Sequence, residues 1–412
     1  MTVHLYYTDS FLYEFDAVVV DTIPPTAAGQ RPALVLDRTA FYPTSGGQVF
    51  DTGVLVPISP AGEQARVVEV AEREDGSILH FVENGAAIPK GSRVHGIIDA
   101  GRRRDHMQQH SGQHLLSAAF VRLFQMPTVS FHMGDDYCSI DLETKSLLSE
   151  QVEAAERLAN EVILENRNVD VRFVTQDEAR SLGLRKLPPP ERGELRLVDI
   201  RDFDLTACGG THVRSTGQIG CILLRKIEKA RQGIRVEFVC GLRAVRSARR
   251  DYTTLAEAAG LYSTHIWELP QQIRKAQDEA KVARRIREQL QAELAEQLAI
   301  RILSETNASN SRKVVARLFA DRELDFIKLL AQTITRLEPN VVAFFGSTQG
   351  QAALVFAQSG GLPFDMGGMM KDALSMLGGR GGGSKDMAQG GPQTTEEIGS
   401  LLKTLAESIQ RS

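Results

Sequence analysis

The sequence predicts an α+β protein of several domains, and three observations carry that prediction. Short strand-like runs separated by turn residues fill the first 95 residues. Helical and strand patterns then follow one another in blocks as far as residue 255. A long charged helix precedes a C-terminal segment with an α/β pattern. The expected domains are therefore 1–95, 96–255, 256–310 and 311–412.

Length and composition are those of an ordinary globular protein. The 412 residues are 42% hydrophobic and 24% charged, with a net charge of −4, so nucleic acid could be contacted only by local patches, such as Arg102–Arg104 or Lys226, Lys229 and Arg231. No long uncharged apolar run predicts a membrane span, and the N-terminus has no secretion signal. The four cysteines show no disulfide-like spacing, so we expect a cytoplasmic protein.

The first 95 residues are expected to form a small β-barrel. The strand candidates are Ala17–Asp21, Ala33–Asp37, Val67–Ala71 and Ile78–Val82, and Glu74-Asp75-Gly76 predicts a hairpin turn. Between them, the run from Asp37 to Gly53 contains the pair Gly46-Gly47. Such a pair usually marks a structural turn, but it also lets backbone amides approach a ligand or an RNA end.

The segment 96–255 contains a helix with two histidines one turn apart, His110 and His114. An apolar stripe from Leu115 to Leu123 would bury this helix and hold both imidazoles in place. A second helix is predicted over 147–168. The expected antiparallel-style strands are Tyr137–Leu142, Arg196–Ile200, Ile219–Leu224 and Ile234–Cys240.

A second motif, Cys208-Gly-Gly-Thr-His212, is expected to be a tight loop because adjacent glycines weaken a helix. Either motif alone is more often free of metal. Together, His110, His114, Cys208 and His212 form a set suited to one Zn²⁺ per chain. Asp204 is either a residue that orients a metal ligand or an ordinary loop aspartate.

The C-terminal part begins with a charged helix over 271–303, whose apolar spacing fits a coiled coil, a helical hairpin or a packed surface helix. Strands are expected near Val341–Phe345 and Ala353–Ala357. The glycine-rich run Gly378–Gly391 is either a flexible linker or a phosphate-cradling loop, and its composition alone favours the linker.

These motifs resemble a known family. His110-x-x-x-His114 followed by Cys208-Gly-Gly-Thr-His212 is similar to the editing domain of alanyl-tRNA synthetases and of free-standing alanyl-tRNA editing proteins. The 37–53 run resembles the family's glycine-rich loop, although Ser45 stands where the family often has a third glycine. Gly378–Gly391 is similar to the DHH-associated domain that ends alanyl-tRNA synthetases. We therefore expect the long free-standing form, without an aminoacylation domain.

The resemblance implies zinc-dependent hydrolysis of the ester that joins serine, and sometimes glycine, to alanine tRNA. It brings Gln48 to the active site and Ser130 near the position that reads the seryl hydroxyl, with Gln113 and His132 as further pocket members. On the residues alone, Ser130 is equally an ordinary strand-edge serine. A site that pairs with this hydroxyl can reject alanine by about 10⁴.

The resemblance also implies that the protein binds the 3′ end and the acceptor or elbow region of alanine tRNA, and that it forms a homodimer through its C-terminal half. The candidate tRNA contacts are Gly46, Gly47, Arg380, Gly381, Gly382, Gly383, Lys385 and Gln389.

Two questions stay open at this point. Four protein ligands close a zinc site, so either one of them, with His212 the first choice, is held loosely, or zinc mainly positions substrate and water. The alternative functions are an editing hydrolase for another mischarged tRNA and a non-catalytic tRNA-binding module with structural zinc.

Overall fold

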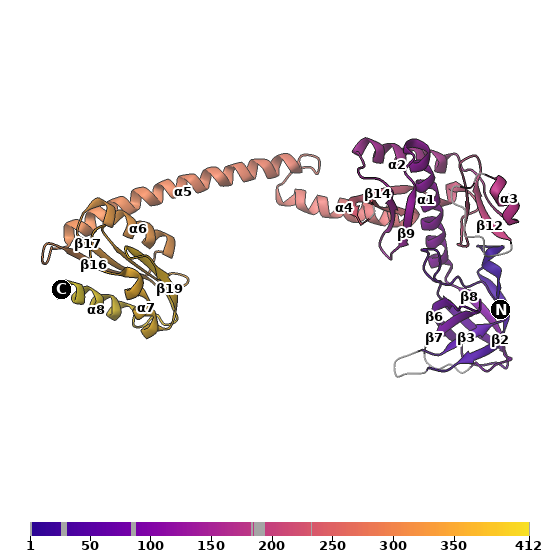
Figure 1. Cartoon of the computed structure of the whole chain (residues 1–412), viewed down its shortest axis with the longest axis horizontal. Helices are drawn as coiled ribbons and strands as arrows, with labels where there is room; N and C mark the ends of the chain where they lie inside the picture. Colours follow the sequence, from indigo (N-terminus) through magenta and orange to yellow (C-terminus); the bar gives the residue numbers. More distant parts are fainter. Residues whose placement is uncertain are drawn as a thin grey trace. The chain divides into compact units, whose positions relative to one another are not determined.

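The computed structural model describes residues 2–25, 31–83, 88–182, 184, 194–231 and 233–411. The chain divides into two compact units, Met1–Glu257 and Ala258–Ser412 (Figure 1). No described helix combines the length and apolar character that a membrane span needs. The mixed α and β architecture agrees with the predicted fold class.

The first unit begins with a closed six-stranded barrel, as predicted. Its strands follow one another in the order β2 (Glu14–Ile23), β3 (Ala33–Leu36), β7 (Ile78–Val82), β6 (Ala65–Glu72), β5 (Gly53–Ser59) and β8 (Arg93–Ile98). Alternate residues point inward and fill the barrel with apolar side chains. The sequence did not reveal β5 and β8, because Pro57 and Gly96 weaken their strand signal. The barrel therefore extends to Ile98, beyond the expected boundary at residue 95.

A short N-terminal segment adds β1 (Val3–His4) and a 3₁₀ turn, η1 (Leu5–Tyr7). β1 pairs in parallel with β4 (Arg38–Thr39) at the side of the barrel.

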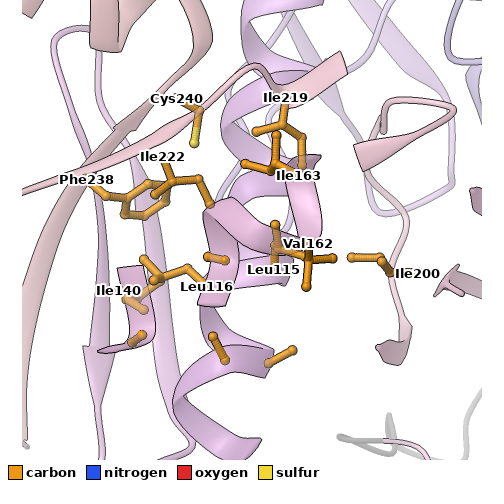
Figure 2. Close-up of a cluster of buried hydrophobic side chains, with 14 of the residues drawn as sticks. Leu115, Leu116, Ile140, Val162, Ile163, Ile200, Ile219, Ile222, Phe238 and Cys240 are labelled. Carbon is orange, nitrogen blue, oxygen red and sulfur yellow. The ribbon is translucent and has the colours of Figure 1, made fainter. Parts of the chain in front are cut away.

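The histidine-bearing helix is α1 (Ala100–Phe124), and it lies in the core of the domain that follows the barrel. Asp99 caps its N-terminus by accepting a hydrogen bond from the Arg102 amide at 3.0 Å, and Gln125 ends it in a left-handed conformation. One apolar side packs against α2 (Ser149–Leu164) and a four-stranded antiparallel sheet (Figure 2). The sheet order is β14 (Ile222–Ala230), β15 (Gly233–Cys240), β10 (Cys138–Leu142) and β9 (Thr128–Met133).

A second, three-stranded sheet delivers the cysteine motif. It consists of β11 (Val169–Val174), β12 (Leu195–Ile200) and β13 (Asp204–Ala207), with α3 (Gln176–Ser181) after β11 and η2 (Thr216–Ile219) after the cysteine loop. Because β13 ends at Ala207, Cys208 is the first residue of the loop.

A buried ion pair joins the barrel to α1. Arg103 and Asp51 are both fully buried, and the guanidinium also donates to the carbonyls of Ser10 and Ala40. Asp51 in turn accepts from the Tyr42 amide at 2.7 Å. Arg103 therefore cannot belong to an RNA-contacting patch with Arg102 and Arg104, as its sequence position had indicated. Its role is to fix the barrel against α1.

Helix α4 (Gly241–Leu261) closes the first unit and crosses into the second, which then continues with the long α5 (Leu269–Glu305). A five-stranded sheet follows, with the order β16 (Lys313–Phe319), β17 (Val341–Ser347), β18 (Ala353–Gln358), β20 (Met387–Pro392) and β19 (Gly379–Gly383). The end of α5 and α6 (Leu324–Leu337) pack on one face of it. Helices α7 (Met366–Leu377) and α8 (Ile398–Arg411) pack on the other.

The glycine-rich run is not a flexible linker, so that interpretation of its composition was wrong. Gly379–Gly383 pairs with β20 as an edge strand, and β20 pairs with β18. On α5, the residues expected to face a helical partner include Ile286, Leu290 and Leu294, which are 46–58% exposed.

Candidate metal centre and active site

Four predicted metal ligands come together in the first unit. His110 and His114 project from α1, and Cys208 and His212 come from the loop after β13. One ligand atom from each of the four lies within 4.8 Å of the others. Cys208 Sγ is 3.4 Å from His110 Nε2 and 3.3 Å from His212 Nε2. The three histidines are 2–4% exposed.

The Nδ1 atom of each imidazole faces a partner on the outside of the cluster. His110 Nδ1 is 2.7 Å from Gln48 Oε1, and His212 Nδ1 is 3.1 Å from Ser111 Oγ. His114 Nδ1 is 3.6 Å from Asp204 Oδ2, which is beyond hydrogen-bond length but within electrostatic reach. Partners on one ring nitrogen fix the ring and leave the other nitrogen for a metal. Asp204 thus lies where a residue that orients a ligand belongs.

Glycine is required at two positions around this cluster. A Cβ atom on Gly210 would lie 2.1 Å from His110 Cε1, so any other residue would displace that imidazole. Gly47 has a φ of +87°, and its Cβ would lie 2.7 Å from the Phe131 ring. Phe131 stacks on His110 with ring centroids 5.5 Å apart. Both glycines therefore allow their loops to close on the same imidazole.

The electrostatics favour a thiolate at Cys208 and a neutral imidazole at His212, whereas burial fails to offset the effect of Cys208 and Asp204, which raise the pKa of His114. Burial alone would raise the pKa of the Cys208 thiol, but the three neighbouring histidines together hold it well below its usual range. Burial lowers the pKa of His212 to about 3, more than the nearby sulfur raises it. A deprotonated sulfur and uncharged imidazole nitrogens are the forms that bind a metal.

The donor set fits zinc. Tetrahedral zinc with ordinary Zn–N and Zn–S bonds separates its donor atoms by about 3.3–3.6 Å. The two sulfur–nitrogen distances at Cys208, 3.3 and 3.4 Å, lie in or next to this range. One cysteine and three histidines are a zinc-type combination.

A cavity of about 310 Å³ opens onto the cluster. His110, His114 and Cys208 contribute to its wall, together with Gly46, Gln113 and Thr128. His212 does not line the cavity, and both its ring nitrogens have neighbours within 3.3 Å. This geometry does not single out His212 as the loosely held ligand.

A buried polar chain forms one wall of the cavity. Gln113 Nε2 donates to Ser117 Oγ at 2.9 Å, and Ser117 Oγ is 2.7 Å from Thr128 Oγ1. Gln113 is 7% exposed and Ser117 is fully buried. Sequence reasoning named Gln113 but missed Ser117 and Thr128. The signal available was the i, i+4 spacing of Gln113 and Ser117 on a helix already assigned to the site.

The other expected pocket members differ in how they meet the cavity. Gln48 is fully buried behind His110, where it also bonds Thr211, and it does not line the cavity. Ser130 edges the cavity, but it is exposed and its hydroxyl donates to Asp141 at 2.7 Å. His132, two residues further along β9, is exposed and outside the cavity wall.

The expected tRNA contacts of the second unit surround a separate cavity of about 560 Å³. Arg380, Gly381, Gly382 and Gln389 line it, beside Gln349 and Gln351 of the β17–β18 turn. Gly383 and Lys385 belong to the same β-hairpin but lie outside the lining.

Three family models match successive parts of the chain: tRNA synthetases class II (A) at residues 10–102, the threonyl and alanyl tRNA synthetase second additional domain at 195–237, and the DHHA1 domain at 310–411. The chain is 33% identical to the alanine–tRNA ligase of Pyrococcus furiosus over 413 residues, which covers 98% of this chain and 43% of the ligase. It thus spans less than half the length of that relative.

The chain is 31% identical over 406 residues to the alanyl-tRNA editing protein AlaX-L of Pyrococcus horikoshii, and the match covers 95% of this chain and 94% of that protein. Among solved structures, the C-Ala domain of Aquifex aeolicus alanyl-tRNA synthetase matches 26% of this chain at 21% identity, with a TM-score of 0.24 that is too low to support a conclusion. On its match to AlaX-L over 94% of that protein and its order of domains, the chain belongs to the family of the alanyl-tRNA editing protein AlaX-L, which is related to alanyl-tRNA synthetase.

Proposed function

We propose that this protein is a trans-editing deacylase that hydrolyses the aminoacyl ester of mischarged alanine tRNA, with the seryl ester as its substrate and the glycyl ester as a second candidate. The observation that carries the proposal is the buried cluster of His110, His114, Cys208 and His212 at the wall of a cavity. The family relationship supports the same reaction class, because the relative that matches over nearly its full length is named as an alanyl-tRNA editing protein.

The four clustered residues would hold one Zn²⁺. When bound, zinc would polarise the ester carbonyl or make a water more acidic. Gln48 and Ser111 orient two of the imidazoles through contacts with their Nδ1 atoms. The buried ion pair of Arg103 and Asp51 fixes the barrel loop that carries Gln48. His114 lines the cavity, and Asp204, 3.6 Å from its Nδ1, would orient this ring.

We assign recognition of the seryl hydroxyl to the polar chain of Gln113, Ser117 and Thr128. Gln113 and Thr128 line the cavity with His110 and His114, and the fully buried Ser117 links them from behind. A polar group that pairs with serine here would be left unpaired by alanine, and that difference in pairing gives discrimination. Ser130 is less suited to recognising the seryl hydroxyl, because its own exposed hydroxyl already donates a hydrogen bond to Asp141.

The partner would be alanine tRNA, with its 3′ end in the first cavity and another part of the tRNA on the glycine hairpin of the second unit. Arg380 supplies the positive charge in the second cavity, and the glycine strands allow close approach of a nucleotide. The exposed apolar residues of α5 support a homodimer. Four free cysteines are consistent with the reducing cytoplasm.

A panel of esters tests the proposal. The protein should hydrolyse seryl-alanine tRNA rapidly and alanyl-alanine tRNA slowly, with glycyl-alanine tRNA as a second candidate substrate. Preference for a seryl or threonyl ester on another tRNA would make it an editing enzyme of different specificity. Tight tRNA binding without hydrolysis of any ester would make it a binding module with a structural metal.

A further inference from the structure

Arg196 lies directly behind the cysteine loop. It is the second residue of β12 and is only 8% exposed. Its Nη1 donates to the Cys208 carbonyl at 2.6 Å, and its own carbonyl accepts from the Cys208 amide at 3.1 Å. Arg196 therefore contacts Cys208 twice, once through its side chain and once through its backbone.

Arg196 also binds the N-terminal segment. Its Nε donates to the Tyr7 carbonyl at 3.0 Å, and its guanidinium lies 5.7 Å from the centre of the Tyr7 ring. The Tyr7 ring faces the other side of the loop, 3.6 Å from where a Cβ on Gly209 would be. One guanidinium thus joins the segment before the barrel to the loop that carries two of the metal ligands.

The charge of Arg196 is balanced differently from that of the other buried arginines. Arg103 pairs with Asp51, and Arg243 pairs with Asp105. Within the described part of the chain, Arg196 forms no ion pair with a carboxylate, and its Nη2 is buried without a hydrogen-bond partner. The groups that its guanidinium contacts are instead the backbone carbonyls of Tyr7 and Cys208.

We propose that Arg196 is a positioning residue for the metal centre: it fixes the Cys208 loop through the Cys208 carbonyl and ties that loop to Tyr7. The inference rests on the proposed metal site and adds a residue that never touches the metal. The planar guanidinium bonds two carbonyls at once, a geometry that lysine cannot reproduce.

The test is a double-mutant cycle on zinc affinity, measured by competition with a chromophoric chelator on the full chain. Arg196→Gln should weaken zinc binding by about 10- to 100-fold, the usual effect of removing a residue that supports a metal ligand. Arg196→Lys should recover only part of this loss. In a Cys208→Ser background, the further change from Arg196→Gln should stay below about twofold, because the sulfur it supports is gone.

Arg243→Gln is the matched control, since it removes a buried arginine that contacts Asp105 rather than the loop. It should leave zinc affinity within about twofold of the wild type. Equal losses of zinc affinity from Arg196→Gln in the wild-type and Cys208→Ser backgrounds would overturn the proposal, as would unchanged affinity in Arg196→Gln. If Arg196→Gln does not fold, the same comparison is made with Arg196→Lys.

A second readout separates this inference from the proposed function. Amide hydrogen exchange of residues 207–211 should accelerate in Arg196→Gln with or without metal, because the carbonyl clamp is lost. Wild-type protein that binds zinc but hydrolyses no ester would refute the proposed function and leave the Arg196 inference intact. Unchanged exchange in the loop would refute the Arg196 inference even if the enzyme is active.

Discussion

Replacing Thr128 with valine is predicted to reduce discrimination between serine and alanine. Valine keeps the shape of threonine and removes the hydroxyl that lies 2.7 Å from Ser117 Oγ at the cavity wall. A neutral hydrogen bond in such a site contributes about 0.5–1.5 kcal/mol. Since 1.4 kcal/mol corresponds to about tenfold in rate, hydrolysis of the seryl ester should fall by about 2- to 12-fold. The alanyl ester has no hydroxyl to lose, so its slow hydrolysis should not change.

The assay is single-turnover deacylation of seryl- and alanyl-alanine tRNA, with the ratio of kcat/KM values as the readout. Ser130→Ala is the control, because its exposed hydroxyl bonds Asp141, and it should change the ratio by less than about twofold. Zinc content should be the same in both variants. Equal loss on the two esters in Thr128→Val, or a large shift of the ratio in Ser130→Ala, would refute the assignment and return the role to Ser130.

Three further predictions follow from the described contacts. Cys208→Ala should lose most of the bound zinc, because it removes the single thiolate of the ligand set, and full zinc occupancy by metal analysis would exclude Cys208 from the site. Burial lowers the pKa of His80 in the barrel core to about 4 from an ordinary value near 6.5. Above pH 6.5, His80 is mostly neutral in both the folded and the unfolded chain. As the pH falls from 6.5 to 4, mainly the unfolded chain gains the proton, so the free energy of unfolding should drop by about 3 kcal/mol between pH 6.5 and 4. Urea titrations at pH 7 and 5 should show about 2 kcal/mol of this decrease, and the decrease should be smaller in His80→Gln. Finally, removing residues from 265 onward should leave deacylation chemistry in place, since all the metal-cluster residues lie before 213, but it should weaken tRNA binding and any dimer. Unchanged tRNA affinity and mass in solution would contradict that division of roles.

The cluster of candidate metal ligands could be predicted from the sequence because the spacing of its members is local. His110 and His114 share a helical face, and Cys208 and His212 share one short loop. The residues that hold them could not be assigned in the same way. Gln48 reaches His110 from a loop 62 positions away, and its placement depends on how the barrel docks through Arg103 and Asp51.

Ser130 shows why position along the chain does not fix the partner of a side chain. Ser130 lies on β9, where the side chains of neighbouring residues point to opposite faces of the sheet. A shift of one position therefore decides whether a side chain points toward His110 or toward the other face. Phe131 stacks on His110, whereas Ser130 pairs across the strand with Asp141. Neither the strand nor its bulge near Asp141 could be placed from the residue pattern alone.

The strand Gly379–Gly383 of the second unit could not be predicted, for a different reason. Glycine has a low preference for strands, so Gly379–Gly383 carries no local strand signal. The strand forms because β20 pairs with it and α7 packs against it. These tertiary contacts outweigh the low strand preference of glycine, and residues of this strand line a cavity.

The central claim is that zinc held by His110, His114, Cys208 and His212 drives deacylation. The most direct measurement is the rate of seryl-alanine tRNA hydrolysis by the full chain after its metal is stripped with a chelator and then restored with one equivalent of Zn²⁺. We expect the stripped protein to lose nearly all activity while keeping its fold by circular dichroism, and the restored protein to regain it. Full activity in stripped protein with verified loss of metal would contradict the claim.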